Sequence, residues 1–69
     1  MKSQDFTYEY RGCLAHVKYK GINVSITIYD KDEGINYGKM ATYTALDYST
    51  LDLISQAQSL IDDIRNDEI

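Results

Sequence analysis

The sequence contains no proline and no tryptophan, and it has only one cysteine and one histidine. A lone Cys13 cannot form an internal disulfide, and a single thiol fits a reducing compartment. His16 has Lys18 and Ser25 as its expected neighbours, so no carboxylate or second metal ligand stands beside it. The chain also lacks a glycine-rich phosphate loop and the residue spacings of a zinc site or a catalytic triad. We therefore expect a protein that is not an enzyme and that uses no cofactor or metal.

Long hydrophobic runs are absent as well. No stretch approaches the roughly 20 apolar residues that cross a bilayer, and no apolar segment follows Met1 and Lys2. The expectation is a cytoplasmic protein that is neither secreted nor inserted in a membrane. With 69 residues the chain predicts a single small domain, 1–69, in which one hydrophobic core only just outweighs the entropy of the unfolded chain.

Positive charge is scarce in the second half of the chain. Residues 1–29 carry four basic and two acidic side chains, whereas residues 30–69 carry three basic and nine acidic ones. The formal net charge of −4 therefore originates in the second half. Because phosphate contacts need clustered lysine and arginine, we expect no direct binding of nucleic acid. The same distribution permits a protein partner with a basic surface.

Residues 48–66 have the pattern of one amphipathic helix. Their apolar side chains follow the helical period of about 3.6 residues, whereas the opposite face is polar. The apolar stripe consists of Leu53, Ile54, Ala57, Leu60, Ile61 and Ile64. Ser49 can cap the helix by accepting a hydrogen bond from the backbone of Asp52, and Tyr48 can pack onto Leu53 as a hydrophobic staple. We expect the rest of the chain to pack against this helix.

Alternating apolar and polar residues predict strands before the helix. The expected strands are 5–10, 13–19, 22–29 and about 35–45. If 11–12 and 20–21 are two-residue turns, every cross-strand pair on one face is apolar. The first hairpin then pairs Tyr10 with Cys13, Tyr8 with Ala15 and Phe6 with Val17, and the second pairs Tyr19 with Ile22, Val17 with Val24, Ala15 with Ile26 and Cys13 with Ile28. A bulged turn with a left-handed glycine is the alternative at either position.

These elements predict an α+β fold, an antiparallel four-stranded β-meander packed on one face by a single C-terminal α-helix. The face under the helix is expected to hold Ile22, Val24, Ile26 and Ile28, with Cys13 buried among them. In the last strand we expect Tyr37, Ala41, Tyr43 and Ala45 to point inward. The far face then carries Thr7, Glu9, Leu14, His16, Lys18, Asn23, Ser25, Thr27 and Tyr29. Gly34 and Gly38 mark positions for a loop or a bulge.

The acidic turn 30–34 has some of the composition of a calcium-binding loop. Such a loop needs an oxygen ligand at its fifth position, glycine at its sixth and a carboxylate at its twelfth. Those positions hold Gly34, Ile35 and Ala41 here. We therefore interpret this stretch as a solvated connection between two strands.

Two sets of residues are candidates for binding a partner. Tyrosine offers a large amphipathic contact area at a low entropic cost and is enriched at interfaces. The second set is acidic: Asp52 lies in the first turn of the expected helix, and the other four residues crowd the negative pole of its dipole, where basic residues are more stabilising. The tyrosines are Tyr29, Tyr37 and Tyr48, and the acidic residues are Asp52, Asp62, Asp63, Asp67 and Glu68. The alternatives are that the tyrosines only fill strand positions and that the acids only aid solubility.

The segment YSTLDLISQAQSLIDDI resembles the strand-to-helix junction of short phage and mobile-element proteins. An aromatic-Thr-Leu-acid start leads into an alanine and then a terminal Ile-Asp, a pattern that is similar to the partly β HicB antitoxins. The resemblance covers the last third of the chain. HicB-like proteins carry a Gly-Cys strand motif just before the helix, whereas Gly12-Cys13 lies far upstream here. The resemblance implies an origin in a phage or mobile element.

The functional hypothesis is a small acidic, non-catalytic protein-binding module, an accessory or inhibitor protein of a phage or mobile element that acts by stoichiometric contact. One alternative is a homo-oligomeric structural module. Another is a nucleic-acid mimic whose acidic residues block a basic DNA-binding site. We expect a homodimer, formed along an edge strand or through the less polar part of the exposed sheet face, because so short a chain without a disulfide or metal gains stability by association. The alternative is a monomer whose open edge binds a different protein.

Overall fold

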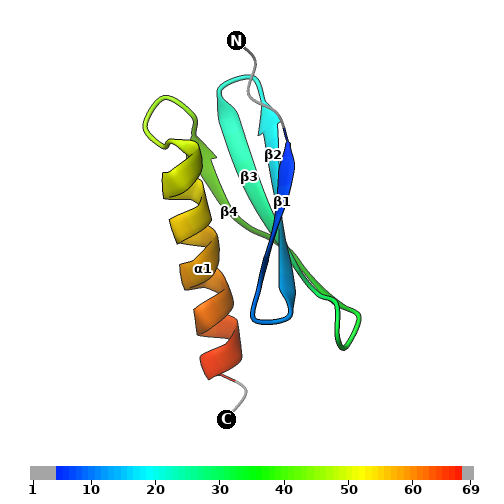
Figure 1. The fold of residues 1–69 in the computed structure, drawn as a ribbon. Coiled ribbons are helices and arrows are strands. Elements are labelled where there is room, and N and C mark those ends of the chain that lie inside the picture. Colours follow the sequence, from blue (N-terminus) through cyan, green and yellow to red (C-terminus); the bar gives the residue numbers. More distant parts are fainter. Residues whose placement is uncertain (1–4, 68–69) are drawn as a thin grey trace.

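The computed structural model describes residues 5–67 and contains a four-stranded antiparallel sheet and one helix (Figure 1). The strands are β1 (Phe6–Tyr10), β2 (Cys13–Lys20), β3 (Asn23–Asp30) and β4 (Ile35–Thr44), and the helix is α1 (Thr50–Asn66). The strands lie in the sheet in their sequence order, so the sheet is a simple meander. The predicted α+β fold with a single C-terminal helix on one face is confirmed.

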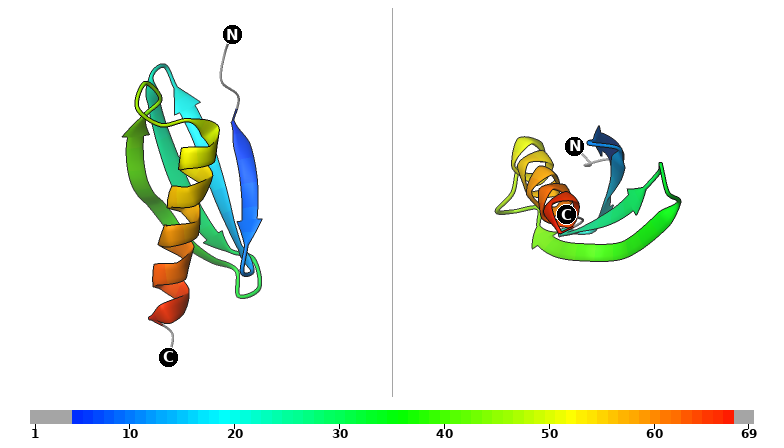
Figure 2. Two further views of the ribbon diagram at one scale, coloured as in Figure 1. Left: turned by 60° about the vertical axis from the view of Figure 1, so that its left-hand side comes forward. Right: turned by 90° about the horizontal axis from the view of Figure 1, so that it is seen from below.

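The hydrophobic core lies between the sheet and α1, which lies lengthwise over one face of the curved sheet (Figure 2). Alternate residues of the two central strands and one stripe of the helix are fully buried. These are Cys13, Ala15 and Val17 of β2, Val24, Ile26 and Ile28 of β3, and Leu53, Ala57 and Ile61 of α1. Among the described residues, no helix is long and apolar enough to pass through a membrane.

The start of α1 agrees with its predicted cap. The Ser49 hydroxyl accepts a hydrogen bond from the Asp52 N–H at 3.2 Å, and the Asp52 carboxylate accepts one from the Ser49 N–H at 3.0 Å. This reciprocal pair is a capping box and satisfies two backbone donors that have no partner inside the helix. Tyr48 precedes the cap, and its ring lies 4.7 Å from the ring of Tyr43, centroid to centroid.

The two hairpins differ in how well the sequence predicted their pairing. The register between β1 and β2 is the predicted one, with a turn at Arg11 and Gly12, both at positive φ. Between β2 and β3 the predicted register is wrong by two residues, because the turn is formed by Gly21 and Ile22. A shift of two residues keeps each side chain on its predicted face, so the composition of the core is almost unchanged.

The shifted register changes the environment of three residues. Ile22 leaves the predicted core face and is 55% exposed in the turn. Cys13 lies opposite Asp30 and not opposite Ile28, although its predicted burial is confirmed. Asp30 becomes the last residue of β3 and points into the core side of the sheet, where it is fully buried.

Strand β4 contains two irregularities that the sequence indicated only through Gly38. The pairing with β3 skips Met40 between Ala41 and Lys39, and it skips Tyr37 between Gly38 and Asn36. The inward positions predicted for Tyr37, Tyr43 and Ala45 are confirmed, since all three pack against the buried core. Each bulge inserts one residue and reverses the alternation of the strand beyond it.

Candidate functional site

The face of the sheet that points away from α1, here called the uncovered face, carries a largely polar set of side chains. The strand register places them in four cross-strand rows. From the β2–β3 turn downward these rows are Lys20, Asn23 and Thr44; Lys18, Ser25 and Thr42; Thr7, His16, Thr27 and Lys39; and Glu9, Leu14, Tyr29 and Asn36. All nine residues predicted for the far face lie on it. Five further residues complete the rows: Lys20, Asn36, Lys39, Thr42 and Thr44.

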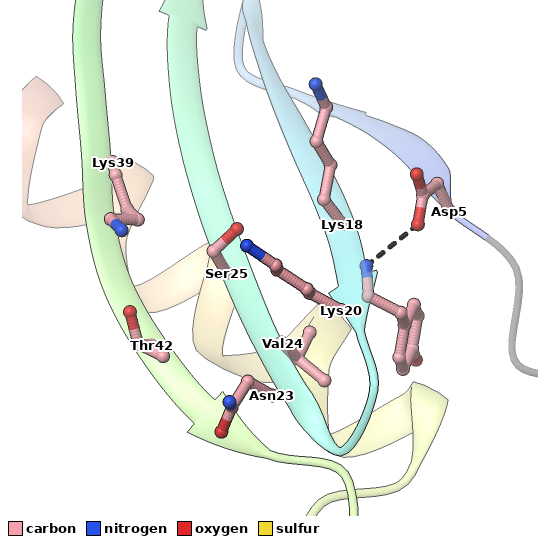
Figure 3. A pocket seen from close by; sticks show the side chains of 9 residues that line it. Asp5, Lys18, Lys20, Asn23, Val24, Ser25, Lys39 and Thr42 are labelled. Carbon is pink, nitrogen blue, oxygen red and sulfur yellow. Dashed lines mark hydrogen bonds between the residues drawn. The ribbon is translucent and has the colours of Figure 1, made fainter.

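Part of this face is hollowed into an open depression of about 600 Å³. We call it the lysine depression, because three lysines line it. Its other lining residues are Asp5, Tyr19, Asn23, Val24, Ser25 and Thr42. Figure 3 shows Lys20 extending from β2 toward Ser25 on β3, with Lys39 on β4 beyond them. Asp5 is tied to the backbone, because its Oδ1 accepts a hydrogen bond from the Tyr19 N–H at 2.8 Å.

Two departures from the expected strand pairing bring the lysines together. In an unbroken β4, Lys39 would share the inward side with Ala41 and Tyr43. The bulge at Met40 instead pairs Lys39 with Thr27 and turns it to the uncovered face. Because the turn lies at Gly21 and Ile22, Lys20 is a strand residue and pairs with Asn23. Sequence reasoning therefore missed two of the three lysines, and Gly38 next to Lys39 was the only signal of the bulge.

The chemistry available at this surface is that of ammonium, hydroxyl and amide groups. Such groups bind anions through charge-assisted hydrogen bonds. His16 lies on the same face, and its Nδ1 is 3.3 Å from the hydroxyl of Thr7. Within residues 5–67 no group of three or more histidine, cysteine or acidic side chains is arranged to hold a metal ion. The surface is suited to binding an anionic group.

The three predicted tyrosines do not converge on one surface. Tyr29 lies on the uncovered face, half-buried and opposite Leu14. Tyr37 occupies a bulge of β4 and packs against the core, and Tyr48 packs beside Tyr43. Only Tyr29 therefore joins the uncovered face, and a binding role for the other two remains a prediction.

The predicted acidic residues are spread along α1. Asp52 is held in the capping box, and hydrogen bonds from the Ser49 backbone and side chain keep the pKa of its carboxyl below the usual range. Asp62 forms an ion pair with Arg11 at 2.8 Å. Asp63 and Asp67 are exposed at the end of the helix, and Glu68 lies outside the described residues. Two of these acids thus have structural partners, and partner binding by the set stays a prediction.

A second charged cluster lies at the opposite end of the sheet, where the end of α1 meets two connections. The Arg65 guanidinium donates to Asp30 Oδ2 at 3.0 Å and to the carbonyl of Arg11 at 2.9 Å. Asp30 Oδ1 accepts the backbone N–H groups of Asp32 and Glu33 at 3.0 and 3.2 Å. Desolvation raises the pKa of Asp30, but these hydrogen bonds and the Arg65 charge outweigh it, so its pKa lies below the usual range.

This cluster is structural. The Asp30 side chain has no exposed surface, and its carboxylate is fully engaged by Arg65 and two backbone donors. Sequence reasoning placed Asp30 in a solvated loop. Asp30 nevertheless continues the series of even-numbered residues, Val24, Ile26 and Ile28, that face the core from β3. That alternation was the signal that Asp30 faces the core side.

Comparison of the chain with protein-family models, with curated proteins and with solved structures finds no match in any of the three. The resemblance to HicB-like and other mobile-element proteins therefore remains a prediction from residues 48–64. The geometry of the uncovered face and the charges that line it are the features of the chain that bear on its function.

Proposed function

We propose that the chain is a non-catalytic protein-binding module that holds its partner on the uncovered face by stoichiometric contact. One observation carries the proposal: α1 covers one face of the four-stranded sheet, and the other face presents four rows of side chains that no described element covers. An accessory or inhibitory role in a phage or mobile element fits such a module. We place this role in the cytoplasm, where a lone Cys13 stays reduced.

The composition of the face supports a protein partner. Leu14 and Tyr29 lie opposite each other at one end and offer a small apolar contact, whereas the lysine depression lies at the other end. Between them lie the hydroxyls of Thr7 and Thr27 and the imidazole of His16. Interfaces between proteins commonly combine an aromatic contact with polar surroundings. The rigid sheet presents these groups in fixed positions, which limits the entropy lost on binding.

A neutral, bulky substitution in the middle of the face tests the proposal. Thr27 lies in the third row, and Thr27→Tyr keeps a side chain that favours strands while filling the docking surface. The matched control is Ser59→Tyr, which adds the same ring to the exposed side of α1. Tagged wild-type protein and both variants are purified from cells of the native host. The proteins that copurify are identified and quantified by mass spectrometry.

The expected result is a stoichiometric partner with the wild type and with Ser59→Tyr, and at least a tenfold lower recovery with Thr27→Tyr. Equal recovery by the two variants contradicts the proposal. Failure of the wild type to retain any stoichiometric partner also contradicts it. Circular dichroism shows that both variants keep the fold.

Self-association is a second candidate, and the regularity of β1 favours it. Strand β1 pairs with β2 without a bulge, and its other edge has no neighbouring strand in residues 5–67. An unpaired regular edge is a template for another strand, whereas the two bulges of β4 make its edge less suitable. A homodimer formed along β1 leaves the uncovered face free for another protein.

A further inference from the structure

We propose that the partner segment bound by the uncovered face is acidic, and that its carboxylates lie in the lysine depression. This inference rests on the proposed function, since it names the chemistry of the partner at the same surface. It reverses the charge expected for the partner from the sequence, where the acidic helix suggested a basic one.

The first observation is the pairing of the basic residues. Residues 5–67 contain six lysines and arginines, and the ion pairs divide them into two groups. Arg11, Lys31 and Arg65 each form an ion pair with a carboxylate at the end of the sheet near Asp30. Among the described residues, no such ion pair joins Lys18, Lys20 or Lys39, and these three line one depression. In an acidic chain with many carboxylates available, a cluster of three unpaired lysines leaves its charge for another molecule.

The second observation is the way Lys39 reaches the cluster. The bulge at Met40 interrupts the ladder between β3 and β4 and turns Lys39 from the core side to the uncovered face. Bulges are frequent next to functional sites, where they redirect a side chain. Lys39 then stands across β3 from Lys18 and Lys20. The hydroxyl of Ser25 on β3 lies between the two sides, and Thr42 lies on β4 with Lys39.

The third observation concerns the balance of charge inside the depression. Among residues 5–67, Asp5 is the only acidic residue that lines it, and one of its oxygens already accepts the Tyr19 N–H. Three ammonium groups and one carboxylate leave an excess of positive charge. A volume of about 600 Å³ accommodates several side chains of an extended segment.

An acidic protein segment suits this site better than a nucleic acid. Proteins that bind single strands stack bases on exposed aromatic rings. Of the aromatic residues in the described chain, only Tyr29 and His16 lie on the uncovered face, and neither lines the depression. Tyr19 does line it, but its side chain packs against the core. A net charge of −4 also repels a long phosphate backbone beyond the reach of three lysines.

The test uses a fluorescent oligoglutamate peptide of about ten residues as the probe, with binding followed by fluorescence anisotropy at low salt. Lys18→Gln and Lys39→Gln each remove one positive charge from the depression. Lys31→Gln is the matched control, because it removes the same charge at the other end of the sheet, where Lys31 pairs with Glu9. Amide chemical shifts of the labelled protein locate the bound probe.

We expect Lys18→Gln and Lys39→Gln each to weaken binding of the probe by about two- to fivefold. The double variant is expected to weaken it by more than about tenfold. The control is expected to bind within about twofold of the wild type, and the shifts are expected to centre on Lys18, Ser25 and Thr42. Equal weakening by Lys31→Gln shows a diffuse charge effect and overturns the inference, as does the absence of measurable binding. An oligothymidylate of the same length that binds more tightly at the same lysines overturns the choice of an acidic protein segment.

The lysine variants also separate this inference from the proposed function. The cellular partner could be lost with Thr27→Tyr but retained by the Lys18→Gln, Lys39→Gln double variant. In that case the uncovered face binds a protein segment that is not acidic, and only the inference fails. If the partner is retained by both, the proposed function fails as well. Loss with both supports the two statements together.

Discussion

The buried pair of Asp30 and Arg65 joins the end of α1 to the sheet. The Asp30 side chain has no exposed surface and the Arg65 side chain is 15% exposed, so both groups have lost most of their hydration. Removing one partner from such a pair leaves an uncompensated charge, which destabilises a protein more than the intact pair stabilises it. Arg65 also donates to the carbonyl of Arg11 and thus holds the first turn against the helix.

Arg65→Met is therefore expected to lower the Tm by on the order of 10 °C, measured by circular dichroism at neutral pH. Methionine has a flexible apolar side chain that keeps much of the packing, but it has neither the charge nor the N–H groups that donate to Asp30 and to the Arg11 carbonyl. Arg11→Met is the control, because its ion pair with Asp62 lies at the surface, with both side chains about 40% exposed. The control is expected to lose only a few degrees. An equal loss in both variants contradicts the role assigned to the buried pair.

The lowered pKa of Asp30 predicts the dependence of stability on pH. A carboxyl whose pKa is lower in the folded protein stabilises the fold above the unfolded value of 3.8, and this contribution is lost as the pH falls through the folded value. The urea midpoint of the wild type should therefore fall steeply as the pH decreases below about 4. Asp30→Asn removes the titrating group and should give a lower midpoint at pH 7 but a flatter curve below pH 4. Parallel curves contradict the assignment.

Sequence reasoning at the residue scale predicted burial better than it predicted contacts. Cys13 is buried as expected, but its neighbour across the hairpin is Asp30 and not Ile28. Alternation identifies the face of the sheet on which a residue lies, and a register shift of two residues leaves that face unchanged. The same shift does change which residue lies opposite on the neighbouring strand. A charged residue on the core side was not expected, because its burial depends on Arg65, which is 35 residues away in the sequence.

At the scale of elements, the helix and the first hairpin were the most predictable. The capping residues and apolar stripe of α1 are local signals, and the structure confirms its cap at Ser49. The second hairpin was mispredicted because Ile22 continues the apolar alternation, whereas the turn uses Gly21 at its first central position. The bulge at Met40 has no comparable local signal, so the position of Lys39 in the candidate site could not be derived from alternation.

The two hairpin turns give a matched prediction about glycine. Gly12 and Gly21 both have positive φ, at +79° and +63°. A Cβ on Gly21 would meet no atom within 4 Å, whereas a Cβ on Gly12 would lie 2.5 Å from Asp32 Oδ2 and 2.9 Å from Arg65 Nη2. Gly21→Ala is expected to cost about 1 kcal/mol of backbone strain, and Gly12→Ala about 2 kcal/mol or more, because it also displaces Arg65 from Asp30. Urea unfolding measures both, and equal costs contradict the close packing at Gly12.

The helix stripe supplies a prediction about the core. Ile61 is fully buried in the cluster that contains Ile26, so Ile61→Ala should lower the free energy of unfolding by about 2 to 4 kcal/mol. Leu51→Ala is the control on the same helix, since Leu51 is 79% exposed and should change the free energy by less than about 0.5 kcal/mol. Similar losses at the two positions contradict the packing of α1 on the sheet.

At the scale of the whole molecule, charge is separated between its two sides. The exposed acidic residues Asp63 and Asp67 lie at the C-terminal end of α1, whereas the lysine depression lies on the face that points away from the helix. The sequence showed an acidic second half but not this separation, because Lys18 and Lys39 come from strands that lie on either side of β3. Composition could not indicate the lysine depression, because the order of the strands in the sheet brings its lysines together.

The free edge of β1 leads to a prediction about the oligomeric state. Two copies that pair antiparallel along Phe6–Tyr10 would form a continuous eight-stranded sheet, with both uncovered faces on the same side. Light scattering over a dilution series should give twice the mass of the chain at about 200 µM and the mass of a monomer at low micromolar concentration. Thr7→Glu should shift the equilibrium toward the monomer. It places a second carboxylate beside that of Glu9 on a short exposed strand, and in the dimer these like charges face the same charges of the other copy. Ser59→Glu adds the same charge on α1 and should leave the mass unchanged. A monomer at the highest concentration rejects the dimer and leaves the edge of β1, like the uncovered face, open to a different protein.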